Sequence, residues 1–133
     1  MHYQKQMLRN IGPLERRILE ILWTKKEASA REICSVLEQE GNRKAYSTVR
    51  TIIKRLVKKK IIQQRLDKQE RMYIYTPIFT KNELEKKIVH SVIGDMLKRF
   101  EQSTISYLAE ELSDNKKDIE KIKQKLNELK KNA

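Results

Sequence analysis

The chain has 133 residues, of which 30 are Lys or Arg and 18 are Asp or Glu, so its formal net charge is +12. This length suits one compact domain or a small domain with an accessory element, and the short apolar runs exclude a membrane-spanning helix. One Cys, two His and three Gly exclude a disulfide framework, a multi-cysteine metal site and a glycine-rich phosphate loop, which leaves a helix-rich, cytoplasmic protein with an anionic partner.

The N-terminal part of the chain predicts a tail and then a first helix. Residues 1–10 contain no apolar stretch of the signal-peptide kind, and we expect them to form a flexible tail. Gly12, Pro13 and Glu15 are typical of a helix cap, a first helical position and a first turn. The apolar face of this helix comprises Leu14, Ile18, Ile21 and Leu22. We expect the helix to end near Trp23.

A second helix opens at a capping box, in which Ser29 and Glu32 each satisfy a backbone amide of the other residue. Its inward residues are Ile33, Val36 and Leu37. Gly41 predicts the end of the helix. Cys34 borders the apolar face, and we expect it to be a small buried hydrophobe rather than a redox sensor.

The segment 46–59 predicts a third helix with two different faces. Its aliphatic residues recur at the spacing of one helix face: Val49, Ile52, Ile53, Leu56 and Val57. The opposite face and its shoulders hold hydroxyl-bearing and basic residues: Ser47, Thr48, Arg50, Thr51, Lys54, Arg55 and Lys58. The segment contains no acidic residue. Short hydroxyls allow close approach to a DNA major groove, and long cations reach base edges or phosphates.

Two strand-like segments, 61–66 and 71–76, predict a hairpin after this helix. The intervening residues lack Gly, so we expect a loop of four or more residues rather than a tight turn. We expect Pro77 to end the second strand. The residues expected to point inward are Ile61, Leu66, Met72 and Ile74, with Tyr73 and Tyr75 on the other face.

Positive charge is concentrated in this part of the chain. Residues 43–71 carry 11 basic and two acidic side chains, which indicates a polyanion-binding surface. Three helices followed by a basic hairpin predict a winged helix-turn-helix, here over residues 11–78. The candidate DNA-binding residues are Arg43, Lys44, Ser47, Thr48, Arg50, Thr51, Lys54, Arg55, Lys58, Arg65, Lys68 and Arg71.

Residues 79–133 predict a helical dimerisation region, which makes the whole chain mainly α with a small β-hairpin. Thr80 and Glu83 form another capping box, and three amphipathic helices follow. A second chain would bury their apolar faces better than this chain alone, and a two-fold dimer suits a helix-turn-helix protein. The expected interface residues are Leu84, Ile88, Val92, Met96, Phe100, Ile105, Leu108, Leu112, Ile119, Ile122, Leu126 and Leu129.

The chain resembles the penicillinase repressor (BlaI/MecI) family of winged-helix transcriptional regulators, within the wider BlaI/CopY superfamily. The resemblance covers nearly the full length. It is carried by Leu14-Glu15, Ile18-Leu19 and Leu22-Trp23, by residues 28–33, by the third-helix segment 45–59 and by residues 73–77. It implies a homodimeric repressor of resistance or stress genes that binds two-fold DNA operators with TACA/TGTA-type half-sites.

The chain departs from the family pattern in three ways. Lys44 replaces a residue that is usually Trp, so the local packing there must differ. No Cys follows Cys34, which argues against the copper sensing of some superfamily members. The family's repressors are cleaved at an Asn-Phe bond by the action of a sensor protease, and the corresponding pair here is Tyr107-Leu108, in an apolar setting that we expect to be buried.

Two other functions remain open on the sequence alone. One is a winged-helix regulator controlled by a small ligand bound between the two parts of the chain. The other is a winged helix that binds an acidic protein or RNA through its basic face. We expect no enzyme, cofactor or metal site, because His90 lacks an acid or nucleophile partner and the carboxylates lie mostly at helix caps or beside Lys.

Overall fold

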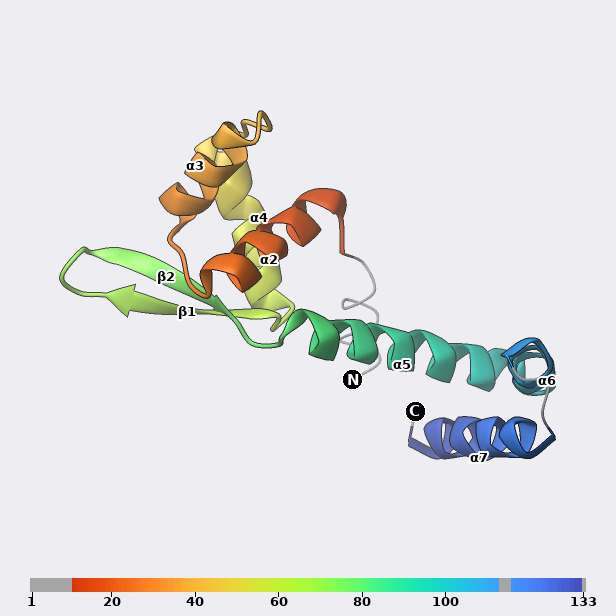
Figure 1. Ribbon diagram of the computed structural model, residues 1–133. Coiled ribbons are helices and arrows are strands. Elements are labelled where there is room, and N and C mark those ends of the chain that lie inside the picture. The colour runs from red at the N-terminus through yellow and green to blue at the C-terminus, as the bar shows by residue number, and fades with distance from the viewer. Residues whose placement is uncertain (1–10, 113–115, 133) are drawn as a thin grey trace. The chain divides into compact units, whose positions relative to one another are not determined.

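The computed structural model describes residues 11–112 and 116–132. The expected tail, residues 1–10, therefore lies outside the described residues. The elements in chain order are α2 (Pro13–Lys25), α3 (Ala30–Gln39), α4 (Tyr46–Lys58), β1 (Ile62–Asp67), β2 (Met72–Pro77), α5 (Lys81–Arg99), α6 (Glu101–Leu112) and α7 (Lys116–Asn132) (Figure 1). The chain divides into two compact units, Met1–Glu85 and Lys86–Ala133, and α5 begins in the first and continues into the second.

The first unit is the predicted winged helix-turn-helix: three helices around one apolar core, followed by an antiparallel hairpin (Figure 1). Each helix contributes one aliphatic face to the core, as their sequence periodicity predicts. The fully buried side chains include Ile18, Leu19 and Leu22 of α2, Ile33 and Leu37 of α3, and Val49, Ile53 and Leu56 of α4. The fold class inferred from the sequence is confirmed.

Two helix boundaries follow from local chemistry. The predicted capping box of α3 is present, with Ser29 Oγ accepting from the Glu32 amide at 3.2 Å and Glu32 Oε1 accepting from the Ser29 amide at 3.1 Å. The α2 helix is longer than expected, because it continues past Trp23 to Lys25 and ends where Lys26 takes a φ of 74°. The indole Nε1 of Trp23 donates to the carbonyl of Phe79 at 2.9 Å, which ties the end of α2 to the segment before α5.

The hairpin pairs Ile62 with Pro77 and Asp67 with Met72, which leaves a four-residue turn as predicted. The Asp67 carboxylate caps this turn by accepting from the amides of Gln69 and Glu70. Pro77 is the last residue of β2, as expected.

The prediction of inward residues in the hairpin was partly wrong. Leu66 is 52% exposed, whereas Tyr75 is buried beside Ile74. The reason is a bridge across the chain: Ala28 exchanges two backbone hydrogen bonds with Tyr75, so the connection between α2 and α3 covers that part of β2. Leu66 lies one residue from the turn, beyond this cover.

The second unit contains the rest of α5 together with α6 and α7. Helices α6 and α7 pack against each other, and Leu97, Ala109 and Leu126 are buried. Thr104 stabilises the junction of α5 and α6 by donating from its hydroxyl to the carbonyl of Met96 at 3.3 Å. No described helix is long and apolar enough to cross a membrane.

Candidate nucleic-acid interface

Helix α4 has one buried and one exposed face, and this division positions the candidate interface. Val49, Ile53 and Leu56 have at most 1% of their surface exposed, so the helix cannot rotate without uncovering the core. The opposite side therefore faces solvent. All twelve candidate DNA-binding residues are exposed: Arg43, Lys44, Ser47, Thr48, Arg50, Thr51, Lys54, Arg55, Lys58, Arg65, Lys68 and Arg71.

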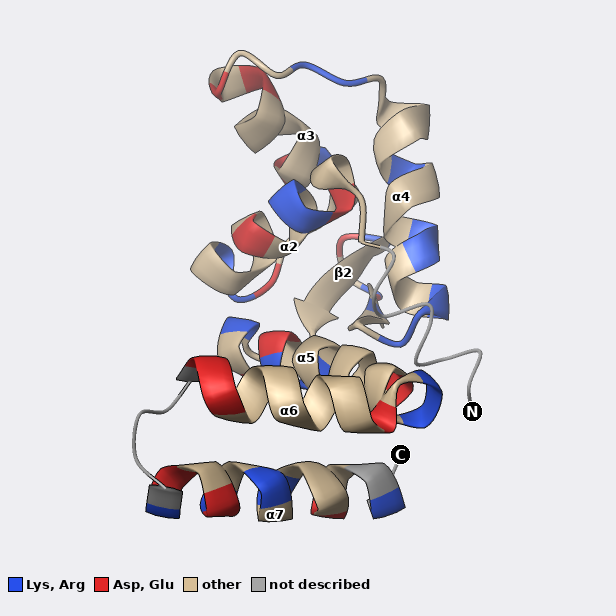
Figure 2. Cartoon of the chain, turned by 90° about the vertical axis from the view of Figure 1, so that its right-hand side faces the viewer, with Lys and Arg blue, Asp and Glu red and all other residues tan. Residues whose placement is uncertain are grey.

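Among the described residues, the cations of α4 have no carboxylate as an ion-pair partner. Figure 2 shows Lys and Arg along α4 and no acidic residue on it. Within residues 11–112 and 116–132, Arg50, Lys54 and Lys58 make no ion pair. On α2, by contrast, Arg17 pairs with Glu20 and with Glu40 of the α3 end. Positive potential is therefore left uncompensated where α4 faces solvent.

The hydroxyl residues of α4 lie one turn apart on its exposed face. Thr51 Oγ1 donates to the carbonyl of Ser47 at 2.9 Å. This bond fixes the Thr51 rotamer and keeps the side chain short and close to the helix axis. The exposed face of the N-terminal half of α4 thus carries the short hydroxyl side chains of Ser47 and Thr51.

The hairpin carries three further candidate cations, which differ in whether they already have an ion-pair partner. Lys68 and Arg71 belong to the four-residue turn, and Arg71 has a φ of 53°. Arg65 in β1 is instead paired with Glu27, at 2.9 Å, in the connection between α2 and α3. The hairpin thus offers two cations at its tip and one that already has a partner.

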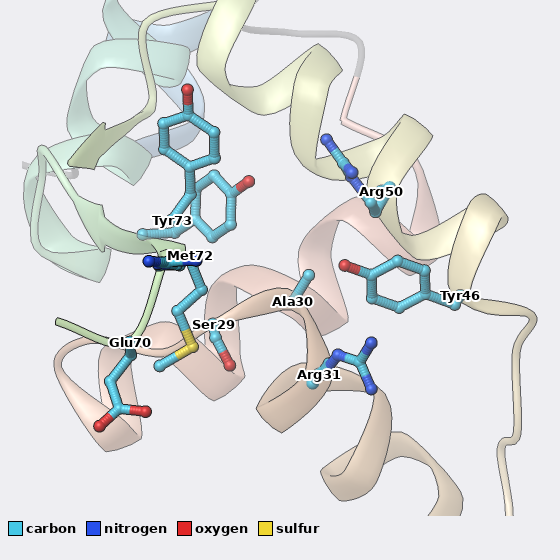
Figure 3. A pocket seen from close by; sticks show the side chains of 10 residues that line it. Ser29, Ala30, Arg31, Tyr46, Arg50, Glu70, Met72 and Tyr73 are labelled. Carbon is cyan, nitrogen blue, oxygen red and sulfur yellow. The ribbon is translucent and has the colours of Figure 1, made fainter. Parts of the chain in front are cut away.

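A groove of about 550 Å³ lies between the start of α3, the start of α4 and the hairpin. Figure 3 shows Arg31, Tyr46 and Arg50 entering it from the helices and Met72 and Tyr73 from β2. The complete lining is Ser29, Ala30, Arg31, Tyr46, Arg50, Glu70, Arg71, Met72, Tyr73 and Tyr75. This groove brings three arginines and three tyrosines together.

Two interactions organise the groove. The Arg31 guanidinium lies over the Tyr46 ring, with Cζ 5.6 Å from the ring centroid, which is a cation–π distance. Burial raises the pKa of Tyr75 above its ordinary 10.0, the Arg50 guanidinium opposes this rise, and Tyr46 and Tyr73 add to it. The Tyr75 hydroxyl consequently keeps its proton.

Sequence reasoning missed Arg31, Tyr46 and Tyr73 as members of this surface. Tyr46 directly precedes the polar face of α4, and Arg31 lies between the two residues of the α3 capping box. The sequence around each residue therefore gave no sign that the two side chains meet. Their contact joins α3 and α4, and the spacing of residues within one helix cannot predict a contact with another helix.

Cys34 is half-buried rather than fully buried. Burial raises the pKa of the Cys34 thiol, Arg31 opposes this rise, and Glu38 adds to it. The thiol therefore stays protonated and weakly nucleophilic. Lys44, which departs from the family pattern, is exposed in the connection before α4 and lines a second hollow with Cys34 and Tyr46.

The expected interface residues of the C-terminal helices vary in exposure within one chain. Leu84 and Leu126 are buried, Met96 and Phe100 are exposed, and the side chain of Leu112 lies outside the described residues. The remaining seven are half-buried: Ile88, Val92, Ile105, Leu108, Ile119, Ile122 and Leu129. Several apolar side chains of α5 and α6 thus remain open to solvent.

The cleavage candidate does not have the buried setting that the sequence analysis expected. Tyr107 is 65% exposed and Leu108 is half-buried. Tyr107 lies on a solvent-facing side of α6, whereas Ala109, two residues later, is fully buried. No group of three His, Cys, Asp or Glu side chains in the described part of the chain is placed to hold a metal ion.

Comparison with known proteins gives consistent relatives. Residues 11–128 match the family model described as penicillinase repressor. The chain is 29% identical over 121 residues to the penicillinase repressor of Staphylococcus aureus, a match that covers 91% of this chain and 94% of that protein. It is 32% identical over 97 residues to the transcriptional regulator BlaI of two Mycobacterium tuberculosis strains, covering 72% of this chain and 65% of that protein.

Proposed function

The chain belongs to the penicillinase repressor family, and we propose that it is a dimeric, sequence-specific DNA-binding repressor of transcription. The observation that carries this proposal is the exposed, acid-free face of α4, whose cations have no ion-pair partner in the described part of the chain. Such a surface matches the phosphate charge and groove width of double-stranded DNA.

In this proposal α4 lies in the major groove. Ser47, Thr48 and Thr51 approach base edges together with Arg50, because they lie at the N-terminal half of the helix. Lys54 and Lys58 further along the helix neutralise phosphates, as do Lys68 and Arg71 at the hairpin tip. The first group supplies sequence preference and the second supplies affinity that depends on salt but not on sequence.

The proposal includes a homodimer formed by the C-terminal helices. The exposure of Met96 and Phe100 supports it, since large apolar side chains at the surface commonly mark an interaction site. A two-fold dimer would place two α4 helices on two half-sites of one operator, which suits the TACA/TGTA-type dyads that the resemblance implies.

We propose that the protein acts in the cytoplasm of a bacterium. Its proposed target genes are resistance genes, because its relatives include a penicillinase repressor. Release from DNA by a cut at Tyr107-Leu108 is the proposed regulatory step, with a sensor protease as partner. Such a cut would separate α7 from the rest of the chain. Because these two residues lie within α6, a protease must first unwind that helix locally.

The test is a footprint on the DNA upstream of the protein's own gene, at near-physiological salt and with excess random DNA. We expect a two-fold protected site that survives the competitor. The variant Lys54→Glu/Lys58→Glu should lose protection, whereas Lys121→Glu/Lys125→Glu on α7 changes the net charge equally and should keep it. Binding that disappears under competitor, or equal loss in both variants, would reduce the basic face to a general polyanion surface.

A further inference from the structure

The groove between α3, α4 and the hairpin has an unusual balance of charge. Its lining holds three arginines, Arg31, Arg50 and Arg71, against one carboxylate, Glu70. In the described part of the chain none of these three arginines makes an ion pair. The tyrosine hydroxyls of the lining add neutral hydrogen-bond donors. The groove is therefore suited to an anion that accepts several hydrogen bonds.

Arg31 is held in place before any ligand arrives. Its guanidinium lies over the face of the Tyr46 ring, with Cζ 5.6 Å from the ring centroid (Figure 3). An arginine above a ring can still present N–H donors to a ligand, and two such donors match two oxygens of one phosphate. Stacking also lowers the side-chain entropy lost on binding.

The groove adjoins the proposed base-reading surface. Tyr46 is the first residue of α4 and directly precedes Ser47, while Arg50 lines the groove from the next turn of the same helix. A DNA strand that passes beside the N-terminal half of α4 would bring its backbone to this groove. A phosphate held there fixes how deeply and at what angle α4 enters the major groove.

We propose that this groove binds a backbone phosphate of one DNA strand, with Arg31 as the phosphate-binding residue and Tyr46 as the residue that positions it. The inference rests on the proposed function and adds to it two residues outside the basic face of α4. Tyr46 acts through Arg31, so its ring matters and its hydroxyl does not.

The experiment measures affinity of the full-length protein for a short duplex of random sequence as a function of salt. Arg31→Gln should lower the slope of log affinity against log salt by about 0.9, the value for one lost phosphate contact. Tyr46→Leu should weaken binding by about two- to fivefold, the range of one exposed cation–π interaction, and Tyr46→Phe should bind like the unaltered protein. In the Arg31→Gln background, Tyr46→Leu should have no further effect.

Arg16→Gln is the matched control, because Arg16 is an exposed arginine on α2 that pairs with Glu20 at 3.5 Å. Its slope should not change. Thermal unfolding of each variant checks that the fold is kept. An unaltered slope for Arg31→Gln, or a loss in Tyr46→Phe equal to that in Tyr46→Leu, overturns this inference while leaving the proposed function intact. Failure of the unaltered protein to bind the duplex overturns the proposed function itself.

Discussion

Lys59 Nζ lies 2.7 Å from Glu15 Oε2, and the two side chains are only 10% and 8% exposed. Lys59 caps the C-terminal end of α4, and Glu15 belongs to the first turn of α2, 44 residues earlier. The pair therefore joins the end of the proposed recognition helix to the first helix of the core. An intact buried pair of this kind adds little net stability, but removing one of its partners lowers the free energy of unfolding strongly.

Glu15→Ala should destabilise the winged helix by about 3–5 kcal/mol, because it removes the carboxylate that pairs with the buried Lys59 ammonium. The measurement is urea unfolding followed by circular dichroism. Glu20→Ala, which removes a carboxylate from exposed pairs on the same helix, should cost less than about 1 kcal/mol. Equal losses in the two variants would mean that the Lys59–Glu15 pair contributes no more than a surface pair.

Arg50→Ala should cost about 1–3 kcal/mol on operator DNA and should reduce the preference for operator over random DNA. The physical reason is the position of Arg50 beside the hydroxyl face of α4, which the proposed binding mode places within reach of base edges. Affinities for an operator duplex and a scrambled duplex, measured at the same salt, give the answer. Equal losses on both duplexes would contradict a base-reading role.

Lys68→Ala should weaken binding to operator and random DNA equally, and should lower the salt slope by about one. Lys68 lies exposed in the turn of the hairpin. In the proposed binding mode its ammonium group would reach phosphate rather than base edges. The same two duplexes over a range of salt concentrations test this. A loss confined to the operator would instead assign sequence recognition to the hairpin.

Phe100→Asp should shift the proposed dimer towards monomer, because a charge would replace a large apolar side chain that is 64% exposed at the junction of α5 and α6. Sedimentation equilibrium should show at least about a tenfold weaker association, the usual effect of losing a central aromatic contact. Lys98→Asp, at an exposed position nearby, is the control and should remain dimeric. If the Phe100→Asp variant remains dimeric, Phe100 does not belong to the interface.

Alkaline pH should destabilise the protein partly through Tyr75. Burial raises the pKa of the folded-state phenol above its ordinary 10.0, although Arg50 opposes the rise and Tyr46 and Tyr73 add to it. The unfolded phenol thus loses its proton first, so the free energy of unfolding is full below the unfolded pKa and falls as pH rises through the folded pKa. Tyr75→Phe should show a shallower fall, measured by urea unfolding at increasing pH. Parallel curves would contradict the assignment.

The sequence predicts the features of this fold that depend on local pattern. The capping box of Ser29 and Glu32 marks the start of α3, and the aliphatic spacing in α4 separates its buried and exposed faces. The position of Tyr75 could not be predicted in this way, because it depends on backbone pairing with Ala28, far away in the chain. A period-two pattern gives two faces of a strand but does not say which one a distant segment covers.

The same contrast between local sequence pattern and contacts between distant segments applies to the candidate site. The basic and hydroxyl residues of α4 could be identified because they share one helix face. The contact between Arg31 and Tyr46 could not, since it forms only when α3 and α4 pack together. The buried setting expected for Tyr107 came from the resemblance to the family, and it is wrong for this chain, because Tyr107 is 65% exposed on α6.

The ion pair of Glu27 and Arg65 has a consequence for how the protein would search a genome. Under the proposed function, Glu27 would offset part of the charge of Arg65, so each encounter with random DNA would gain less from this arginine than from one without a carboxylate beside it. Shorter residence on wrong sequences lets a DNA-binding protein sample more of them in a given time. In the proposed complex, Glu27 would therefore compete with DNA phosphates for Arg65, which would lower affinity for random DNA and shorten each encounter.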